Sequence, residues 1–460
     1  MSSRLELINP ANGERFRELP YHNWDEVESL LVKADNTQKQ WKHTEISERI
    51  HLVKAAMDYF RDNKHSIAEN ITQQMGKPIS QSMNEVKGMI HRAEVCCDLA
   101  DEALKDISLP KANGLRRFIK REPLGVVLDI AAWNYPLLIA VNVVVPAVLA
   151  GNAVAIKHSS LTPLCGIAFK DAFAFANAPK GLVTALVINH IVAEEIINSN
   201  LIDHLAFTGS VSAGRKIQST IKDHFIGTGF ELGGKDPAFI REDADLDMTI
   251  PAVMDGVFYN GGQSCCGVER IYVHESLFDK FVAGGIKYMN NLKIGDPMDD
   301  KIDMGPLAQY SGLQTIQKQL TDAEEKGAVI TRHIGACPNG DNYFLPAILT
   351  KVNHQMDIMR DESFGPIVGI MPVQSDAEAI QLMNDSPYGL TASVWTKDTE
   401  KALEIGNQIE TGTFYMNRCD VLDPALPWVG VKDSGRSCTL STLGIQGMTR
   451  PKSFNLKIGR

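Results

Sequence analysis

Metal-binding and disulfide patterns are absent from the 460-residue sequence. Its 8 cysteines form no CxxC pair and no Cys–His metal spacing, and the adjacent pairs Cys96-Cys97 and Cys265-Cys266 are badly spaced for a disulfide framework. A basic block is also missing, and 46 Lys and Arg against 56 Asp and Glu give a net charge of −10. We therefore expect no bound metal and no nucleic-acid partner, because clustered cations are needed to hold a phosphate backbone.

An uninterrupted apolar run of membrane-spanning length is missing as well. No charged residue occurs from Ile130 to Ile156, but tryptophan, asparagine, proline and glycine interrupt the segment. A strand, a turn, a helix and a second strand therefore explain it better than a membrane span does. The first residues, Met1 to Phe16, contain no apolar stretch of signal-peptide length. We expect a cytoplasmic protein without a membrane partner.

The remaining composition, 44% hydrophobic and 22% charged, is that of a globular chain long enough for several domains. Apolar residues recur at helical spacing over Asp25–Trp41, Arg49–Asn63 and Met83–Leu104. Near Leu109–Arg121 the pattern becomes short, basic and strand-like, and the turn signal Ala112-Asn113-Gly114 lies inside it. We expect a two-stranded excursion at that point.

Strands and helices alternate in the next part of the chain. The predicted strands are Leu124–Ala131, Ala153–Lys157, Thr184–Ile188, Leu205–Phe207 and Pro237–Ile240, and the predicted helices are Leu137–Leu149, Leu164–Ala176 and Val211–Lys222. A second alternation runs from Arg270 to about Asn417. Strands that are apolar on both faces and separated by helices predict an α/β fold with two doubly wound, Rossmann-like lobes.

The most informative loop has the sequence Asn260-Gly261-Gly262-Gln263-Ser264-Cys265-Cys266. An amphipathic helix containing Ile250–Val257 precedes it, and the strand Arg270–Val273 follows it. Cys265 is therefore expected on a tight loop, where a thiolate can face a cleft. A buried structural role is more common for an arbitrary cysteine, but a glycine-rich loop with a preceding glutamine favours a nucleophile.

Two further loops carry polar groups near the ends of predicted strands. Glu231 precedes two glycines in Glu231–Pro237; beside a nucleophilic cysteine it would be the base that activates water, whereas alone it would be a loop acid facing solvent. Asn134, in Trp133–Pro136, follows the strand Leu124–Ala131, and ligands of open α/β sheets bind beyond that strand end. Its amide could donate to an oxyanion, or it could be a turn former before the proline.

These loops, in this order, resemble the aldehyde dehydrogenase superfamily over nearly the whole chain, from Asn9-Pro10-Ala11 to Arg450–Ser453. The matching stretches are Trp133–Pro136, Phe207–Ser210, Glu231–Pro237, Gly262–Cys265, Glu362–Pro366 and Gly430–Arg436. Any one of them is a weak signal, but six in family order are specific. The chain is also similar to the short succinic semialdehyde dehydrogenases of that superfamily.

The resemblance implies a mechanism for three residues. Cys265 would attack the aldehyde carbon to form a thiohemiacetal, whose oxyanion the Asn134 amide and the Cys265 backbone N–H would stabilise. Hydride transfer to NAD or NADP would leave a thioester. Glu231 would then activate the water that hydrolyses the thioester to the carboxylic acid.

Cofactor binding has no GxGxxG motif to rely on, as is normal for this superfamily. The resemblance implies instead that Thr208-Gly209-Ser210 meets the pyrophosphate at a helix N-terminus, with Ser210 as the cap and Gly214 allowing close approach. The other cofactor residues that it implies are Ile130, Trp133, Lys157, Ser160, Glu362 and Phe364. Without the resemblance, Lys157 would be a solvated lysine and Glu362 a surface acid.

One departure from the family bears on the choice of cofactor. After Lys157 the family usually has Pro-Ser-Glu, whereas this chain has His158-Ser159-Ser160. The missing carboxylate removes a repulsion toward a 2′-phosphate. We therefore expect NADP to be accepted beside NAD.

The substrate is expected to be an uncharged or weakly polar aldehyde. In the succinic semialdehyde enzymes tunnel arginines receive the distal carboxylate, but Asn142 and Tyr259 stand at the matching positions here. The expected tunnel residues are Leu138, Ile139, Asn142, Tyr259, Ser264, Cys266 and Trp428. Succinic semialdehyde remains the alternative substrate, because Arg418 or Arg436 could turn into the tunnel.

The resemblance also implies a division into three parts. Residues 1–104 and 122–233 would form the cofactor-binding domain, residues 234–447 the catalytic domain, and residues 105–121 and 448–460 a small β oligomerisation element. Exposed strand edges need a partner, so we expect a homodimer or homotetramer.

A cysteine hydrolase and a non-enzymatic binding protein are the rival functions. The hydrolase is disfavoured because no histidine lies in a recognisable motif, and the binding protein because all three catalytic residues are retained.

Overall fold

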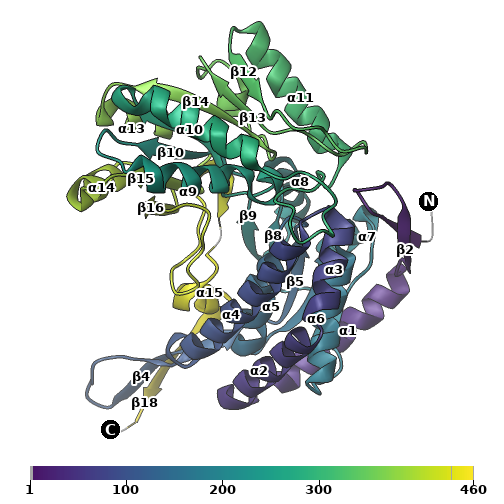
Figure 1. Cartoon of the computed structure of the whole chain (residues 1–460). Helices are drawn as coiled ribbons and strands as arrows, with labels where there is room; N and C mark the ends of the chain where they lie inside the picture. The colour runs from purple at the N-terminus through teal and green to yellow at the C-terminus, as the bar shows by residue number, and fades with distance from the viewer. Residues whose placement is uncertain (1–3, 437, 459–460) are drawn as a thin grey trace.

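The computed structural model describes residues 4–436 and 438–458 and has two lobes (Figure 1). The first lobe, purple to teal in Figure 1, contains a six-stranded sheet of order β17-β9-β8-β5-β6-β7. The second lobe, largely green, contains a seven-stranded sheet of order β12-β13-β14-β11-β10-β15-β16. The predicted α/β fold with two doubly wound lobes is confirmed.

Helices dominate the first hundred residues, as the apolar periodicity predicts. They are α1 (Trp24–Trp41), α2 (Ile46–Asp62), α3 (Lys64–Met75) and α4 (Ile79–Leu104). Asn23 starts α1 with a capping box, because its side chain accepts from the Glu26 backbone and the Glu26 carboxylate accepts from the Asn23 backbone. An antiparallel hairpin of β1 (Arg4–Ile8) and β2 (Arg15–Pro20), which the sequence patterns did not reveal, precedes these helices.

The first sheet alternates with helices along the chain. Its strands are β5 (Val126–Ala131), β6 (Ala153–His158), β7 (Val183–Ala185), β8 (His204–Thr208), β9 (Gly227–Glu231) and β17 (Gly435–Arg436); its helices are α5 (Pro136–Ala150), α6 (Pro163–Phe175), α7 (His190–Asn198) and α8 (Val211–Thr220). All of these strands are parallel except β17, which pairs antiparallel with β9. The edge strand β7 stops at Ala185, so the predicted strand Thr184–Ile188 is too long at its carboxyl end.

The apolar segment Ile130–Ile156 folds as the end of β5, helix α5 and most of β6, as predicted. Both strands are buried at every position. Helix α5 is buried at all but one of its positions, because it packs between the first sheet and α4. Within the described ranges, no helix is long and apolar enough to cross a membrane.

The second sheet follows the same alternation. Its strands are β10 (Asp236–Ile240), β11 (Val268–His274), β12 (Val329–Arg332), β13 (Ala347–Thr350), β14 (Ile367–Val373), β15 (Thr391–Trp395) and β16 (Thr413–Met416); its helices are α9 (Leu246–Phe258), α10 (Phe278–Asn291), α11 (Tyr310–Glu325), α12 (Asp357–Arg360), α13 (Asp376–Asn384) and α14 (Thr399–Gly406). A last helix, α15 (Ser441–Gly447), returns to pack on α4 of the first lobe.

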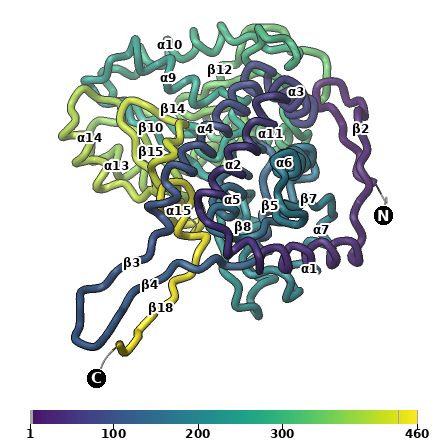
Figure 2. Tube along the Cα trace, turned by 90° about the horizontal axis from the view of Figure 1, so that it is seen from below, coloured from purple at the N-terminus to yellow at the C-terminus, as the bar shows by residue number. Residues whose placement is uncertain are grey.

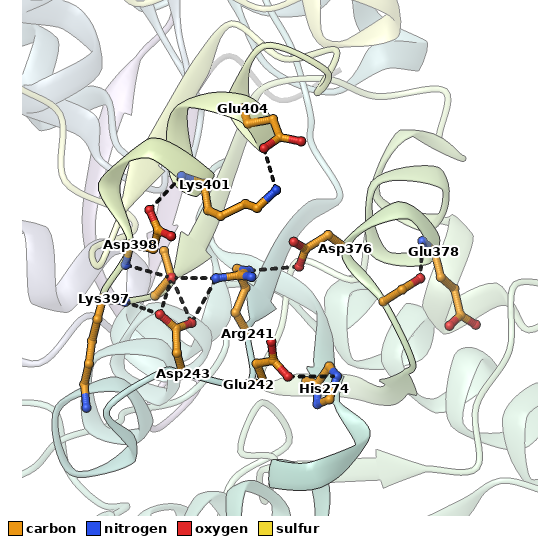
Figure 3. Close-up of polar contacts among 12 residues, drawn as sticks. Arg241, Glu242, Asp243, His274, Asp376, Glu378, Lys397, Asp398, Lys401 and Glu404 are labelled. Carbon is orange, nitrogen blue, oxygen red and sulfur yellow. Dashed lines mark hydrogen bonds and ion pairs between the residues drawn. The ribbon is translucent and has the colours of Figure 1, made fainter.

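Arg241 follows β10 and braces the carboxyl edge of the second sheet (Figure 3). Its Nε donates to Oδ1 of Asp376 at 2.8 Å, and its Nη1 donates to Oδ1 of Asp243 at 3.1 Å and to Oγ1 of Thr396 at 3.0 Å. Cys265 lies before β11, which runs parallel to β10. The Arg241 network therefore lies at the opposite edge of the sheet from the cysteine loop.

A separate three-stranded sheet contains β3 (Ile107–Ser108), β4 (Leu115–Pro123) and β18 (Thr449–Lys457) in the order β18-β4-β3. Figures 1 and 2 both show β4 and β18 extending away from the two lobes. Their antiparallel register places Phe118 opposite Phe454, and the two rings stack with centroids 4.5 Å apart. The predicted β excursion is correct, and the C-terminal strand supplies its main partner.

The two large sheets meet where the chain passes from one to the other. Glu231 is the last residue of β9 and Asp236 is the first residue of β10. The carboxyl edge of the first sheet therefore faces the amino edge of the second. Asn134 follows β5 and Cys265 precedes β11, so the three predicted catalytic residues lie at this junction.

Candidate active site

Two cavities meet at the junction of the sheets. One, of about 300 Å³, is lined by residues of α4, α5, α9 and the segment 419–428. The other, of about 390 Å³, is lined by the loops after β5, β8 and β9 and by residues 362–364. Thr208, Glu231 and Cys265 line both cavities, so groups bound in either one reach the same thiol and carboxylate.

Glycine geometry shapes the loop that carries Cys265. After α9 the chain makes a short turn, Tyr259–Gly262, in which Asn260 and the two glycines have φ angles of 54°, 64° and 69°. A Cβ on Gly262 would lie 2.3 Å from the carbonyl oxygen of Gly365, so glycine is required there. The loop is compact, as predicted, and leaves Cys265 partly exposed at the meeting point of the cavities.

Asn134 is held against this loop. Asn134 is only 3% exposed, and its Nδ2 donates to the backbone carbonyl of Gln263 at 3.2 Å. Its backbone carbonyl accepts from Nζ of Lys77 at 2.8 Å and from Nδ2 of Asn260 at 3.1 Å. A primary amide carries two hydrogens, so one donor of Asn134 remains for a ligand.

An ion pair between Lys77, just before α4, and Glu85, on α4, supports the Asn134 turn. Both side chains are 1% exposed. Oε1 of Glu85 accepts from the backbone N–H groups of Leu137 at 2.8 Å and Leu138 at 3.4 Å, at the start of α5. A carboxylate is favourable at a helix N-terminus, so this pair fixes both the turn and the helix that follows it.

Glu231 ends β9, so the prediction that it lies on a loop is corrected: the strand continues to this residue through its pairing with Thr208. Its Oε1 accepts from Oγ1 of Thr439 at 2.5 Å, and its Oε2 accepts from Oγ1 of Thr208 at 3.5 Å. Burial raises the pKa of the Glu231 carboxyl, while Thr439, the Arg92 guanidinium and Thr208 oppose that rise. A raised pKa suits a base that accepts a proton from water.

The larger cavity contains five of the predicted cofactor residues, namely Trp133, Gly209, Ser210, Glu362 and Phe364. Ser210 caps α8 as predicted, because its Oγ accepts from the backbone N–H of Ala213 at 3.3 Å. The rings of Trp133 and Phe364 lie edge to face, with centroids 5.5 Å apart. Burial, with the neighbouring Glu269, raises the pKa of Glu362 to about 8. A helix N-terminus beside an aromatic wall fits a dinucleotide.

The other four predicted cofactor residues do not line this cavity. Ile130 is buried in β5, and Ser160 is exposed after β6. Gly214 faces Leu232, where a Cβ would lie 2.7 Å from the leucine Cδ2, so glycine allows α8 to approach closely. Lys157 is 5% exposed, and its ammonium has no hydrogen bond or ion pair with any residue in the described ranges. An uncommitted ammonium at the end of β6 fits ribose hydroxyls.

The smaller cavity brings together most of the residues expected in the substrate tunnel. Six of the expected residues line it: Leu138, Ile139, Asn142, Tyr259, Cys266 and Trp428. Ser264 does not line it, because this residue is buried and its hydroxyl donates to Oδ1 of Asp420 at 3.1 Å. Sγ of Cys266 donates to the same carboxylate oxygen at 2.9 Å, so Asp420 holds the loop beneath Cys265.

The tunnel contains an arginine that corrects the sequence expectation. Arg92, on α4, lines the cavity, and its Nη1 donates to the carbonyl of Leu138 at 3.0 Å and to Oδ1 of Asn142 at 3.2 Å. Arg418 is exposed and Arg436 donates to Thr228 at 2.9 Å, and neither lines the cavity. The arginine that lines this cavity is therefore Arg92, and not Arg418 or Arg436, the two that the sequence offered.

Some of the residues that the sequence patterns missed carry a local signal, and others carry none. Glu85 and Arg92 are seven positions apart on one helix, and such residues share a face. Glu85 lies on the buried face of α4 among apolar residues, and a charge in such a place indicates a buried polar site. Thr439 and Asp420 carried no comparable signal, because both lie on loops and reach the site only when the C-terminal segment folds back.

The arrangement as a whole fits an oxidoreductase with a cysteine between its substrate and cofactor cavities. A thiol placed where two cavities meet can bind a substrate covalently in one cavity while a cofactor in the other faces the same carbon. A hydrolase would need no such second cleft.

Comparisons with known proteins agree with this class. The aldehyde dehydrogenase family model matches residues 1–454. The aldehyde dehydrogenase of Paenarthrobacter nicotinovorans is 33% identical over 460 residues, which cover 98% of this chain and 99% of that protein. The succinate-semialdehyde dehydrogenase (NADP(+)) of Mycobacterium leprae is 32% identical over 448 residues, which cover 96% of this chain and 97% of that protein.

A solved structure gives the same result at the level of the fold. The betaine aldehyde dehydrogenase of Staphylococcus aureus, a point mutant in complex with NAD+, superposes with a TM-score of 0.94 at 28% identity, covering 99% of this chain and 94% of that chain. The chain belongs to the aldehyde dehydrogenase family. The predicted activity, an NAD(P)-dependent aldehyde dehydrogenase, is confirmed.

Proposed function

We propose that Cys265 is the nucleophile, Glu231 the general base and Asn134 the oxyanion donor of the aldehyde oxidation. The observation that carries this proposal is that Cys265 and Glu231 line both cavities. The aldehyde enters through the smaller cavity and the cofactor through the larger one. The two reactants then meet beside one thiol.

The first step is the addition of the Cys265 thiolate to the aldehyde carbon, which gives a thiohemiacetal. The negative oxygen accepts hydrogen bonds from Nδ2 of Asn134 and from the backbone N–H of Cys265. Such a donor contributes about 2.7–4 kcal/mol to transition-state stabilisation. The contacts of Asn134 with Gln263 and Lys77 keep the amide in place before the substrate arrives.

The second step is the hydrolysis of the thioester that remains on Cys265 after the hydride has left. Glu231 accepts a proton from a water molecule as that water attacks the thioester carbon. The thiolate then leaves, and the carboxylic acid is released. Thr439 and Thr208 hold the two carboxylate oxygens of Glu231, which orients the base.

The cofactor, NAD or NADP, supplies the hydride acceptor when it is bound in the larger cavity. Lys157 and Ser160 bind the adenosine ribose, and Gly209 and Ser210 bind the pyrophosphate at the start of α8. The residues Ile130, Trp133, Gly214, Glu362 and Phe364 complete the cleft around the adenosine and nicotinamide halves. The exposed hydroxyl of Ser160, in place of a carboxylate, permits a 2′-phosphate.

The domain division follows the sheets. We assign residues 1–104 and 122–233 to cofactor binding, residues 234–447 to catalysis, and residues 105–121 and 448–460 to oligomerisation. Strand β17 is an exception, since it belongs to the catalytic segment but pairs with β9 of the first sheet.

The unpaired edge of β18 supports a homodimer or homotetramer. Eight free cysteines support a cytoplasmic location.

The test follows the absorbance of reduced nicotinamide when the protein is mixed with NAD or NADP and a panel of aldehydes. We expect turnover by the native chain and a loss of at least about 1,000-fold in Cys265→Ser, with thermal unfolding unchanged. Cys438→Ser, which changes a thiol outside both cavities, is the matched control. Ester hydrolysis without cofactor, and no turnover with any aldehyde, would instead favour a cysteine hydrolase.

A further inference from the structure

The guanidinium of Arg92 lies in the substrate cavity with most of its donors unused. Only Nη1 makes hydrogen bonds, to the Leu138 carbonyl and to Asn142. Nε and Nη2 bond to no residue in the ranges 4–436 and 438–458, and no carboxylate there forms an ion pair with Arg92. These two nitrogens form one edge of the guanidinium fork.

Three other buried cations have their partners within the protein, whereas Lys157 has none in the described ranges. Lys77 pairs with Glu85, and Lys235 pairs with Glu269 at 2.6 Å. Arg270 has no ion pair with any residue that the structure describes, but its Nε, Nη1 and Nη2 all donate to backbone carbonyls. A buried charge is costly unless it is paired or hydrogen-bonded. Like the ammonium of Lys157, the open edge of Arg92 therefore lacks the partner that a purely structural role would supply within the described ranges.

The cavity around Arg92 is otherwise acidic. Burial lowers the pKa of Arg92, while Cys266, Glu231, Glu85 and Cys265 oppose that fall. Asp255 and Asp420 also line the cavity. Oδ1 of Asp420 is occupied by Ser264 and Cys266, and Glu85 is occupied by Lys77. Among the charged residues that line this cavity in the described ranges, Arg92 is the one cation, so an anion would be attracted there and not at the carboxylates.

We propose that the open edge of Arg92 binds an anionic group of the aldehyde substrate, at the end remote from the reacting carbonyl. The inference rests on the proposed function, because it needs the carbonyl at Cys265. Nε and Nη2 offer two parallel N–H donors, the geometry that a carboxylate or a phosphate accepts in bidentate form. Leu138 and Asn142 orient the guanidinium by holding Nη1.

The experiment compares kcat/KM for four aldehydes: succinic semialdehyde, glyceraldehyde 3-phosphate, the neutral pentanal and the cationic 4-aminobutanal. The two anionic compounds distinguish a carboxylate from a phosphate as the bound group. We expect the native enzyme to prefer one anionic compound over pentanal. In Arg92→Met the ratio of kcat/KM for that compound to kcat/KM for pentanal should fall by about 100-fold, as for loss of one partner of a buried charge pair.

Three variants make the result specific. Arg92→Lys keeps the charge but lacks the fork, so it should recover only part of the ratio. Asn142→Leu removes the hydrogen bond that orients Arg92 and should lower the ratio by a smaller factor than Arg92→Met. Arg418→Met, an exposed arginine outside the cavity, is the matched control and should leave the ratio unchanged.

Several outcomes would overturn the inference while leaving the proposed function in place. One is an equal loss for all four aldehydes in Arg92→Met, which would mean that Arg92 supports Cys265, Glu231 or the fold. Another is a native preference for pentanal or 4-aminobutanal. Failure of the proposed function is different in kind, because then no aldehyde would reduce NAD or NADP in the native enzyme and Cys265→Ser would change nothing.

Discussion

The hydroxyl of Thr439 donates a hydrogen bond of 2.5 Å to Oε1 of Glu231, across 208 residues of sequence. Thr439 lies on a loop after β17, and its backbone pairs with Trp428, which lines the substrate cavity. The same loop therefore contributes to the substrate wall and to the electrostatics of the proposed base. This contact leads to a prediction about pH.

Thr439→Val should move the acid side of the pH–rate profile to higher pH. Burial raises the pKa of Glu231, and the Thr439 hydrogen bond lowers it, so removing that bond raises the pKa further. The base works when it is deprotonated, so turnover at neutral pH should fall and should recover at higher pH. Steady-state kcat measured against pH would check this. Thr439→Ser, which keeps the hydroxyl, should restore the native profile, and a uniform loss at every pH would contradict the prediction.

Glu231→Gln should separate hydride transfer from hydrolysis. An amide accepts no proton from water, so the thioester on Cys265 should accumulate after one round. Rapid mixing with excess aldehyde should show about one equivalent of reduced cofactor per site, followed by very slow turnover. Full steady-state turnover in this variant would remove Glu231 from the mechanism.

Ser160→Glu should shift the preference from NADP toward NAD. Ser160 is exposed after β6, three residues beyond the uncommitted ammonium of Lys157. A carboxylate there can accept hydrogen bonds from ribose hydroxyls, and its repulsion of a 2′-phosphate should cost on the order of 1 kcal/mol or more. The ratio of KM values for the two cofactors measures the effect. Ser160→Gln is the uncharged control; an unchanged KM for NADP in Ser160→Glu would place Ser160 away from the 2′ position.

Lys77→Met should lower both stability and turnover. The change leaves the Glu85 carboxylate buried without its cation, and breaking a buried pair in this way costs about 3–5 kcal/mol. It also removes the donor to the Asn134 carbonyl, which should disturb the oxyanion site. Urea unfolding and kcat on the same preparation would measure both effects.

A surface ion pair provides the control for that measurement. Lys39 and Asp35 pair on α1 with side chains 60% and 43% exposed, so Lys39→Met should change stability by less than about 1 kcal/mol. The double variant Lys77→Met with Glu85→Leu should regain part of the lost stability, because no unpaired charge remains. Equal effects of Lys77→Met and Lys39→Met would mean that burial of the Lys77 pair contributes little.

Local patterns explain most of what could be predicted about the fold. The apolar spacing in α1, α2 and α4 and the continuous apolar runs of β5 and β6 follow from repeats of 3.6 and 2 residues. The sequence patterns did not predict the hairpin β1–β2, because its strands are short and largely polar on the exposed side. Glu231 was expected on a loop because no local signal marks it as part of a strand; ladder pairing with β8 continues β9 to that residue.

The sequence by itself determined the family and the residues that carry the proposed chemistry. Cys265 and Glu231 stand beside glycines whose turn geometry is local, and Asn134 precedes a proline that starts a helix. Such short motifs depend on the backbone of a few neighbouring residues, so they can be recognised without the rest of the molecule.

Only the tertiary structure decided which charges surround those residues. Thr439 reaches Glu231, Lys77 reaches Asn134, and Arg92 reaches Asn142, each across dozens to hundreds of residues. These contacts depend on how α4, α5 and the C-terminal segment pack together, and packing has no short-range signature. The sequence offered only Arg418 and Arg436 as cations for the expected tunnel. The packing of α4 against α5 instead placed the guanidinium of Arg92 in the smaller cavity.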